Sequence, residues 1–372
     1  MTSEKYIWTN NSFSTTFLWL QTFDIELCPD LITDEIDLLM SKIQELLEHN
    51  HLGFNNITKV VLYIKKMSTF ININQIYKHY FKFKPPTRIC VAQPVDSDFN
   101  IMMELHGVIR VEDIKVLHVQ SVSCWAPANI GPYSQACRSP MVTHYAGQIG
   151  LGPARMILIY PTSLKQLTQS FKNFERVLNC MGNTFDDVIQ CIVYCKSDAA
   201  HKDKIEERVK DKLPQCPTLY LWVKELPKNA KVELSMVSMK SELKKDFWEK
   251  QNTIEVEGIQ TKVFHQHLEI DNKWEIDVVA LDFESDAVIT KEYFIEILKL
   301  TINSGLDEDN LEDDPEVLNI FYERELTEYM CEFRRMLAKC LESIIKGLIL
   351  NCIPVQWLAN GSITILRRKF IE

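Results

Sequence analysis

An internal repeat with an offset of 131 residues is the feature of this 372-residue sequence that most limits the folds it can adopt. Residues 54–65 and 185–196 match position by position, and each segment leads through a polar stretch to a Pro-Thr step, at Pro86 and at Pro217. An apolar run follows each step at the same offset. We therefore expect two copies of one supersecondary unit, each of which needs neighbours to bury its apolar face.

Both copies predict the same order of elements. An amphipathic stretch precedes each match, with apolar residues at three- and four-residue steps over residues 36–47 and again over residues 167–178. That spacing is typical of a helix with one buried face. Each unit is then predicted as hairpin, helix, strand, helix, strand and strand, which indicates an α+β fold with a mixed sheet and helices packed on one face. The expected domains are residues 1–118 and residues 119–245.

The last third of the chain, residues 246–372, carries weaker signals. It is either a diverged third copy of the repeat or a C-terminal extension, and the pattern alone leaves both open. The expected elements are a hairpin (262–267 and 274–282), a helix (290–302), a solvated acidic loop (307–316), a long helix opened by Pro315, and a closing strand (363–370).

Composition narrows the class of protein. Lys and Arg number 41 and Asp and Glu number 51, so the formal net charge is −10. This acidic balance argues against binding to nucleic acid or to an anionic membrane surface, since both need a basic footprint. The 11 cysteines are scattered and include no CxxC pair. The sequence also shows no signal segment and no apolar stretch that could span a bilayer. Together these features predict that the cysteines are buried, reduced thiols in a cytoplasmic protein.

A distinctive motif begins the second copy. Residues 125–135 read WAPANIGPYSQ and residues 145–150 read YAGQIG. These segments resemble the RidA/YjgF family, whose members carry an APxAIGPYSQ segment followed by SGQI. The LPK at residues 226–228 and the VEL at residues 232–234 also fit that family. The resemblance implies tandem RidA/YjgF-like domains of the chorismate-mutase-like fold.

The tandem arrangement, with residues 121–135 between the copies, is similar to the C-terminal half of the eukaryotic diphthine–ammonia ligase family. In that family an ATP-pyrophosphatase domain precedes RidA-like domains, and the enzyme uses ATP and ammonium to amidate diphthine on elongation factor two. The resemblance covers roughly residues 1–245. Because no SGGKDS-type loop occurs, we expect this chain to be only the RidA-like accessory part, with no cofactor of its own, while the complete ligase would use ATP.

The resemblance also implies partners. These are elongation factor two or a separate ATP-pyrophosphatase domain, and no nucleic acid or membrane. RidA proteins are trimers with ligand clefts between subunits, so a trimer-like assembly of RidA-like domains is expected here, within one chain or between chains.

Stand-alone RidA enzymes hydrolyse 2-imino acids, and the resemblance implies that an arginine, a glutamate and the IGPY tyrosine form their site. The second copy has Tyr133, but Leu219 and Ser235 occupy the expected arginine and glutamate positions. The first copy keeps Arg88 and Glu104 at the repeat offset. The candidate site is therefore a composite cleft of Arg88, Glu104 and Tyr133. The alternative is that Arg88 forms a salt bridge and Glu104 is a solvated strand residue.

Three functions stay open on this basis: the accessory part of a ligase, an independent 2-imino acid deaminase, and a scaffold that has kept the fold without the chemistry. No metal site is expected. His265 and His267 lie two apart on a probable strand, but the sequence indicates no third ligand for them.

Overall fold

The structure is a computed structural model whose described residues leave several gaps. They are 5–10, 15–20, 32–93, 100–140, 142–239, 242–256, 258–271, 274–283, 293, 296, 316–323, 349–355, 357–358 and 363–370. The chain divides into two compact units. The first comprises Met1–Pro214 with Val223–Ser241, and the second comprises Gln215–Trp222 with Glu242–Glu372.

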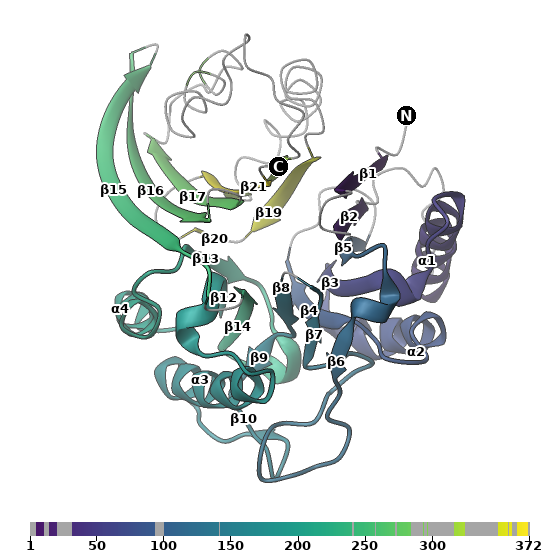
Figure 1. Cartoon of the computed structure of the whole chain (residues 1–372). Helices are drawn as coiled ribbons and strands as arrows, with labels where there is room; N and C mark the ends of the chain where they lie inside the picture. Colours follow the sequence, from purple (N-terminus) through teal and green to yellow (C-terminus); the bar gives the residue numbers. More distant parts are fainter. Residues whose placement is uncertain are drawn as a thin grey trace. The chain divides into compact units, whose positions relative to one another are not determined.

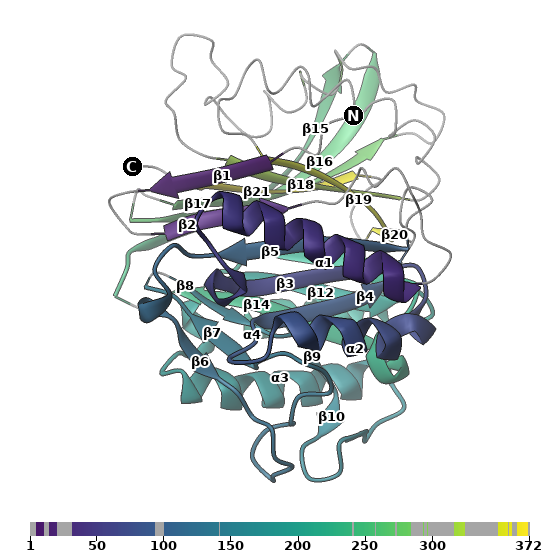
Figure 2. The same ribbon diagram turned by 90° about the vertical axis from the view of Figure 1, so that its right-hand side faces the viewer.

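The first repeat copy is a small sheet covered by two helices. Strand β3 lies at its centre, parallel to β4 and antiparallel to β5. Helices α1 and α2 lie on one face of this sheet (Figure 2), and their apolar residues form one core with the inward-facing residues of the strands. The elements are β1 (Lys5–Asn10), β2 (Thr15–Leu20), α1 (Ile32–His49), β3 (Ile57–Ile64), α2 (Phe70–Tyr80), β4 (Thr87–Ala92) and β5 (Ile101–Gly107).

The second copy repeats this plan. Within the first unit its strands follow the order β12-β14-β8-β7-β6, and β9 also pairs with β14. Helix α3 packs against β14 and β9 (Figure 1). The elements are β6 (Lys115–Leu117), β7 (Ala136–Arg138), β8 (Val142–Tyr145), β9 (Gln148–Ile149), β10 (Leu151–Gly152), β11 (Ile157–Leu158), α3 (Ser163–Cys180), β12 (Val188–Lys196), α4 (Lys202–Lys212), β13 (Thr218–Val223) and β14 (Val232–Met239).

The sequence repeat is preserved element by element. Helices α1 and α3 begin at residues 32 and 163, which differ by the same 131 positions as the starts of β3 and β12, of β4 and β13, and of β5 and β14. Even the short turn before the central strand is kept. The side chain of Asn56 accepts a hydrogen bond from the backbone N–H three residues earlier, and Asp187 does the same in the second copy. The predicted α+β class, with a mixed sheet and helices on one face, is confirmed.

The second unit is built on a sheet of order β15-β16-β17-β21-β18-β19, and β13 pairs with β20 in the same unit. The predicted hairpin and the closing strand are confirmed as β16, β17 and β21. The elements are β15 (Lys245–Val256), β16 (Ile259–Ile270), β17 (Trp274–Phe283), β18 (Glu316–Glu323), β19 (Ile349–Val355), β20 (Trp357–Leu358) and β21 (Ile363–Phe370).

One expectation for this part of the chain is wrong. Pro315 was expected to open a long helix, but the residues that follow it form β18, which pairs parallel with β19 and antiparallel with β21. The apolar stripe expected for that helix, residues 326–348, lies outside the described residues. Val317, Ile320 and Phe321 are residue types that favour strands, and pairing on both edges outweighs the helical preference of Pro315. The acidic run 307–315 lies outside the described residues. Of the helix expected at 290–302, only Tyr293 and Glu296 are described, both helical.

The described cysteines include no disulfide. Cys90, Cys137, Cys191, Cys195 and Cys216 are buried free thiols, as expected. The expectation of burial is wrong for Cys124 and Cys180, which are exposed. None of the described helices has the length and apolar character needed to cross a membrane.

Candidate functional site

A pocket opens where the two repeat copies meet inside the first compact unit. Its cavity volume is about 30 Å³, which is room for a water-sized group with the side chains as they lie here. The first copy contributes Phe70, Arg88 and Cys90 to its wall, and the second copy contributes most of the remainder, including Tyr133 and Glu233. The pocket is therefore composite, since neither copy forms it alone.

Arg88 is the cation of this pocket. It is the second residue of β4, and only 3% of it is exposed. Its guanidinium carbon lies 4.9 Å from the ring centre of Tyr77, 5.3 Å from that of Phe70 and 5.6 Å from that of Tyr133. Neither terminal nitrogen, Nη1 nor Nη2, has a hydrogen-bond partner among the described residues. A buried guanidinium held by rings and lacking acceptors is suited to bind a carboxylate through both nitrogens.

The motif segments of the second copy hold Arg88 in place. The backbone N–H of Gly147 donates to the carbonyl oxygen of Arg88 at 3.1 Å, and that of Ser134 donates to Pro86 at 3.0 Å. A Cβ at Gly131 would lie 2.5 Å from Nη2 of Arg88. The turn of the IGPY segment can pass over the guanidinium only because this position has no side chain.

Glu233 is the carboxyl group of the pocket. It lies on β14 and is 3% exposed, and its Oε2 has no hydrogen-bond partner among the described residues. Burial raises the pKa of this carboxyl to about 8, although the nearby charge of Arg88 acts in the opposite direction. Glu233 is therefore largely protonated at pH 7 and can gain or lose a proton close to neutral pH, as a general acid or base must.

Tyr133 belongs to the same pocket. Its hydroxyl accepts a hydrogen bond from the backbone N–H of Ile130 at 3.3 Å, which closes the IGPY turn on itself. Burial raises the pKa of Tyr133, so the hydroxyl stays neutral. The ring contributes an apolar wall beside the guanidinium of Arg88 rather than a charge.

The third residue of the predicted cleft, Glu104, lies elsewhere. It sits on β5 opposite Val61, is 5% exposed, and its Oε1 lies 2.6 Å from Nε2 of His106. Glu104 is not among the residues that line the pocket. The structure thus brings Arg88 and Tyr133 together and sets Glu233 beside them, whereas Glu104 forms a buried pair with a histidine.

Sequence reasoning missed Glu233 for a specific reason. Glu233 and Ser235 lie two residues apart on β14 and share one face, so the two-residue alternation of strand side chains does not distinguish them. The register does distinguish them. Both residues pair with β12, Glu233 with Tyr194 and Ser235 with Ile192, but of the two only Glu233 also pairs with Ile149 of β9, next to the glycine turn that borders the pocket. The sequence signal that could have identified Glu233 was Gly147, because a glycine leaves space for a neighbouring side chain that no local sequence pattern identifies.

Replacing Gly147 with alanine is expected to destabilise the chain by about 1–3 kcal/mol, the usual cost of overpacking. A Cβ at this position would overlap Oε1 of Glu233, whose side chain would have to leave its position. Denaturant unfolding measures the effect.

The double variant Gly147→Ala with Glu233→Ala serves as the control. It removes the overlapping atoms, so it is expected to cost less than the sum of the two single changes. Additive costs would mean that the glycine does not clear space for Glu233.

The sequence comparisons agree with this two-copy arrangement. The family model described as Endoribonuclease L-PSP matches residues 21–108 and residues 124–240, one segment in each copy and together more than half of the chain. A 2-iminobutanoate/2-iminopropanoate deaminase of Dermatophagoides farinae is 30% identical over 115 residues, which make up 30% of this chain and 88% of the deaminase.

Two ligases match over a longer stretch. The diphthine–ammonia ligase of Schizosaccharomyces pombe is 36% identical over 207 residues, and that of Saccharomyces cerevisiae is 27% identical over 233 residues. These alignments cover 55% and 54% of this chain, and the chain spans 34% of each ligase. Both resemblances seen in the motifs are thereby confirmed, and the chain belongs to the Endoribonuclease L-PSP family, with two tandem copies of its domain.

Proposed function

We propose that the two family copies serve the reaction of diphthine–ammonia ligases as the accessory part of such an enzyme. The observation that carries this proposal is the length of the match. An alignment of 207 residues is longer than either family segment, so the likeness includes the tandem arrangement and not one domain alone. By this resemblance the reaction is the ATP-dependent amidation of diphthine on elongation factor two, and ATP would bind an ATP-pyrophosphatase domain.

Reconstitution in yeast cells that lack their own ligase tests this proposal. The cells would receive an ATP-pyrophosphatase domain alone, this chain alone, or both as separate chains. Mass spectrometry of the diphthine-bearing peptide of elongation factor two distinguishes the carboxylate from the amide. We expect amide only when both chains are present. Amidation by the ATP-pyrophosphatase domain alone, at the same level as with both chains, would contradict the proposal.

A second candidate function, hydrolysis of a 2-imino acid, is favoured by the contents of the pocket. Arg88 would hold the substrate carboxylate with its two free nitrogens. A water molecule would add to the carbon of the protonated imine while the ionised form of Glu233 takes one of the water protons. Glu233 would return that proton to the nitrogen, and the new hydroxyl group would give its proton to Glu233 as the carbon–nitrogen bond breaks and ammonia leaves. The product is a 2-keto acid, and water supplies its new oxygen. A pKa of about 8 suits Glu233 to both proton transfers near neutral pH.

An imine-hydrolysis assay separates these possibilities. A 2-imino acid would be generated in solution by an amino-acid oxidase, and its conversion to 2-keto acid would be followed with and without the chain. If the chain accelerates this step, Glu233→Gln is expected to lower the rate by about 100-fold or more, because proton transfer to and from a positioned group is lost.

Glu104→Gln is the matched comparison, since Glu104 is also a buried strand carboxylate but lies outside the pocket. Loss of rate in Glu104→Gln with retention in Glu233→Gln would assign the role to Glu104 instead. If the folded chain gave no acceleration, imine hydrolysis would be excluded and a scaffold role in the ligase would remain.

Nucleic acid is not a proposed ligand. The net charge of −10 and a pocket with a single arginine beside a buried carboxyl group offer no basic groove for a phosphate backbone.

A further inference from the structure

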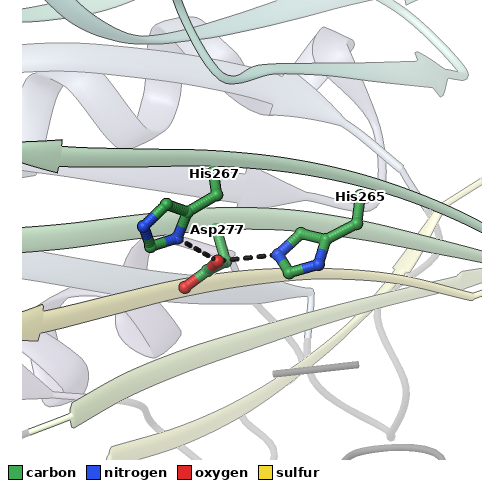
Figure 3. Close-up of side chains that lie close together, drawn as sticks. All are labelled: His265, His267 and Asp277. Carbon is green, nitrogen blue, oxygen red and sulfur yellow. Dashed lines mark hydrogen bonds and ion pairs between the residues drawn. The ribbon is translucent and has the colours of Figure 1, made fainter. Parts of the chain in front are cut away.

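A cluster of two histidines and one aspartate belongs to the second compact unit, whereas the pocket belongs to the first. His265 and His267 lie two residues apart on β16 and therefore project from the same face of the sheet. Asp277 lies on β17 directly across from His267, so the strand register brings it to the same face. In Figure 3 the Asp277 carboxylate lies between the two imidazole rings. The structure thus supplies the third ligand type that the sequence did not indicate.

The three side chains converge on one point. Nε2 of His265 lies 2.7 Å from Oδ1 of Asp277, and Nδ1 of His267 lies 2.8 Å from the same oxygen. One potential ligand atom from each residue lies within 4.8 Å of those of the other two. Ligand atoms about 2.0–2.1 Å from a tetrahedral metal lie roughly 3.3 Å apart. Small rotations of the two rings away from Asp277 would therefore open space for an ion.

Burial restricts the movement of the side chains in this cluster. Asp277 is 1% exposed and His265 is 8% exposed. The indole of Trp248 on β15 covers the cluster, stacked on the His267 ring at 5.0 Å and edge-on to the His265 ring at 4.7 Å. A ligand set held in place by packing and shielded by an aromatic ring loses little conformational entropy when it binds an ion.

We propose that His265, His267 and Asp277 bind one divalent transition-metal ion, with zinc or iron(II) as the chemical class. Two imidazoles and one carboxylate are the donor set that such ions prefer, whereas calcium and magnesium take oxygen ligands. Three protein ligands leave at least one coordination position for water or another group. Of the described residues, these three form the one group of His, Cys, Asp or Glu side chains arranged to hold a metal.

A neighbouring positive charge sets a limit on the affinity. Lys250 lies across from His265 on β15, and its ammonium lies 4.7 Å from the centre of the Trp248 ring. This ammonium disfavours a second positive charge nearby, so we expect micromolar rather than picomolar binding of zinc.

Cobalt(II) titration of the full-length, metal-stripped chain tests the proposal, because bound Co²⁺ reports its ligands through its visible absorption. We expect one Co²⁺ per chain, displaced by one Zn²⁺, without the near-ultraviolet band of a cobalt–thiolate bond. The absence of that band separates this site from the exposed thiols Cys124 and Cys180. Isothermal titration with Zn²⁺ then gives the affinity.

Asp277→Asn and His267→Gln are each expected to weaken Zn²⁺ binding at least 10-fold. The control is His79→Gln, which alters an exposed histidine of α2 and should bind as the wild type does. Thermal unfolding of each variant in EDTA verifies folding. Zn²⁺ should raise the melting temperature of the wild type and of His79→Gln only. If folded His267→Gln bound Zn²⁺ as tightly as the wild type, or if the wild type bound none at micromolar concentrations, the proposal would be overturned.

Discussion

Replacing Arg88 with glutamine is expected to weaken binding of small carboxylates such as 2-oxobutanoate by about 100-fold. The guanidinium is buried and its two terminal nitrogens lack partners among the described residues, so a bound carboxylate would be their natural acceptor. Hydrogen bonds between charged groups contribute roughly 1.5–3 kcal/mol each, and 1.4 kcal/mol corresponds to a tenfold change in affinity. Isothermal titration of the full chain with the carboxylate measures the loss.

Two further variants sharpen this experiment. Arg88→Lys keeps the positive charge but loses the planar fork, so we expect an intermediate affinity. Arg110→Gln is the matched control, because Arg110 is an exposed arginine that bonds to Asp113 rather than to the pocket. It should bind as the wild type does. Equal weakening in Arg110→Gln, or unchanged affinity in folded Arg88→Gln, would contradict the assignment of Arg88 as the carboxylate ligand.

Glu233 is expected to make the stability of the chain depend on pH between about 5 and 8. Burial raises its pKa from the ordinary 4.5 to about 8, so over this range the folded state keeps a proton that the unfolded chain has released. The contribution of the protonated group is fully present below pH 4.5 and is lost as the pH rises through 8. At about 1.4 kcal/mol per pH unit between 4.5 and about 8, the total effect is roughly 5 kcal/mol.

Urea unfolding at several pH values measures this dependence. In Glu233→Gln the side chain cannot ionise, so the free energy of unfolding should fall much less between pH 5.5 and pH 8 than it does in the wild type. Glu207→Gln, a change at an exposed residue of α4, should follow the wild-type profile. A Glu233→Gln profile that is parallel to the wild-type profile would mean that Glu233 ionises alike in both states.

The candidate site was only partly predictable from the sequence. The IGPY and GQI segments border the pocket, since their glycines lie against the guanidinium of Arg88 and the carboxyl group of Glu233. The second copy has Leu219 where the first copy keeps Arg88, and this difference pointed to a site shared between the copies. Which carboxyl group lies beside Arg88 depends on the position of the residue along β14, and the spacing of residues in the sequence does not give that position. Arg88 and Glu233 lie 145 positions apart in the chain and meet only through packing of the two copies.

The sequence by itself determined the repeat and the element types within it. Helix spacing and the apolar strand runs are local patterns, so they reproduce the same elements at a constant offset of 131 residues. The tertiary structure alone decided three features: the strand after Pro315, the carboxyl group beside Arg88, and the position of Asp277 between His265 and His267. Each depends on which strand lies next to which and in what register. Local sequence limits which strands can pair and in what register, but the packing of distant segments determines which pairing forms.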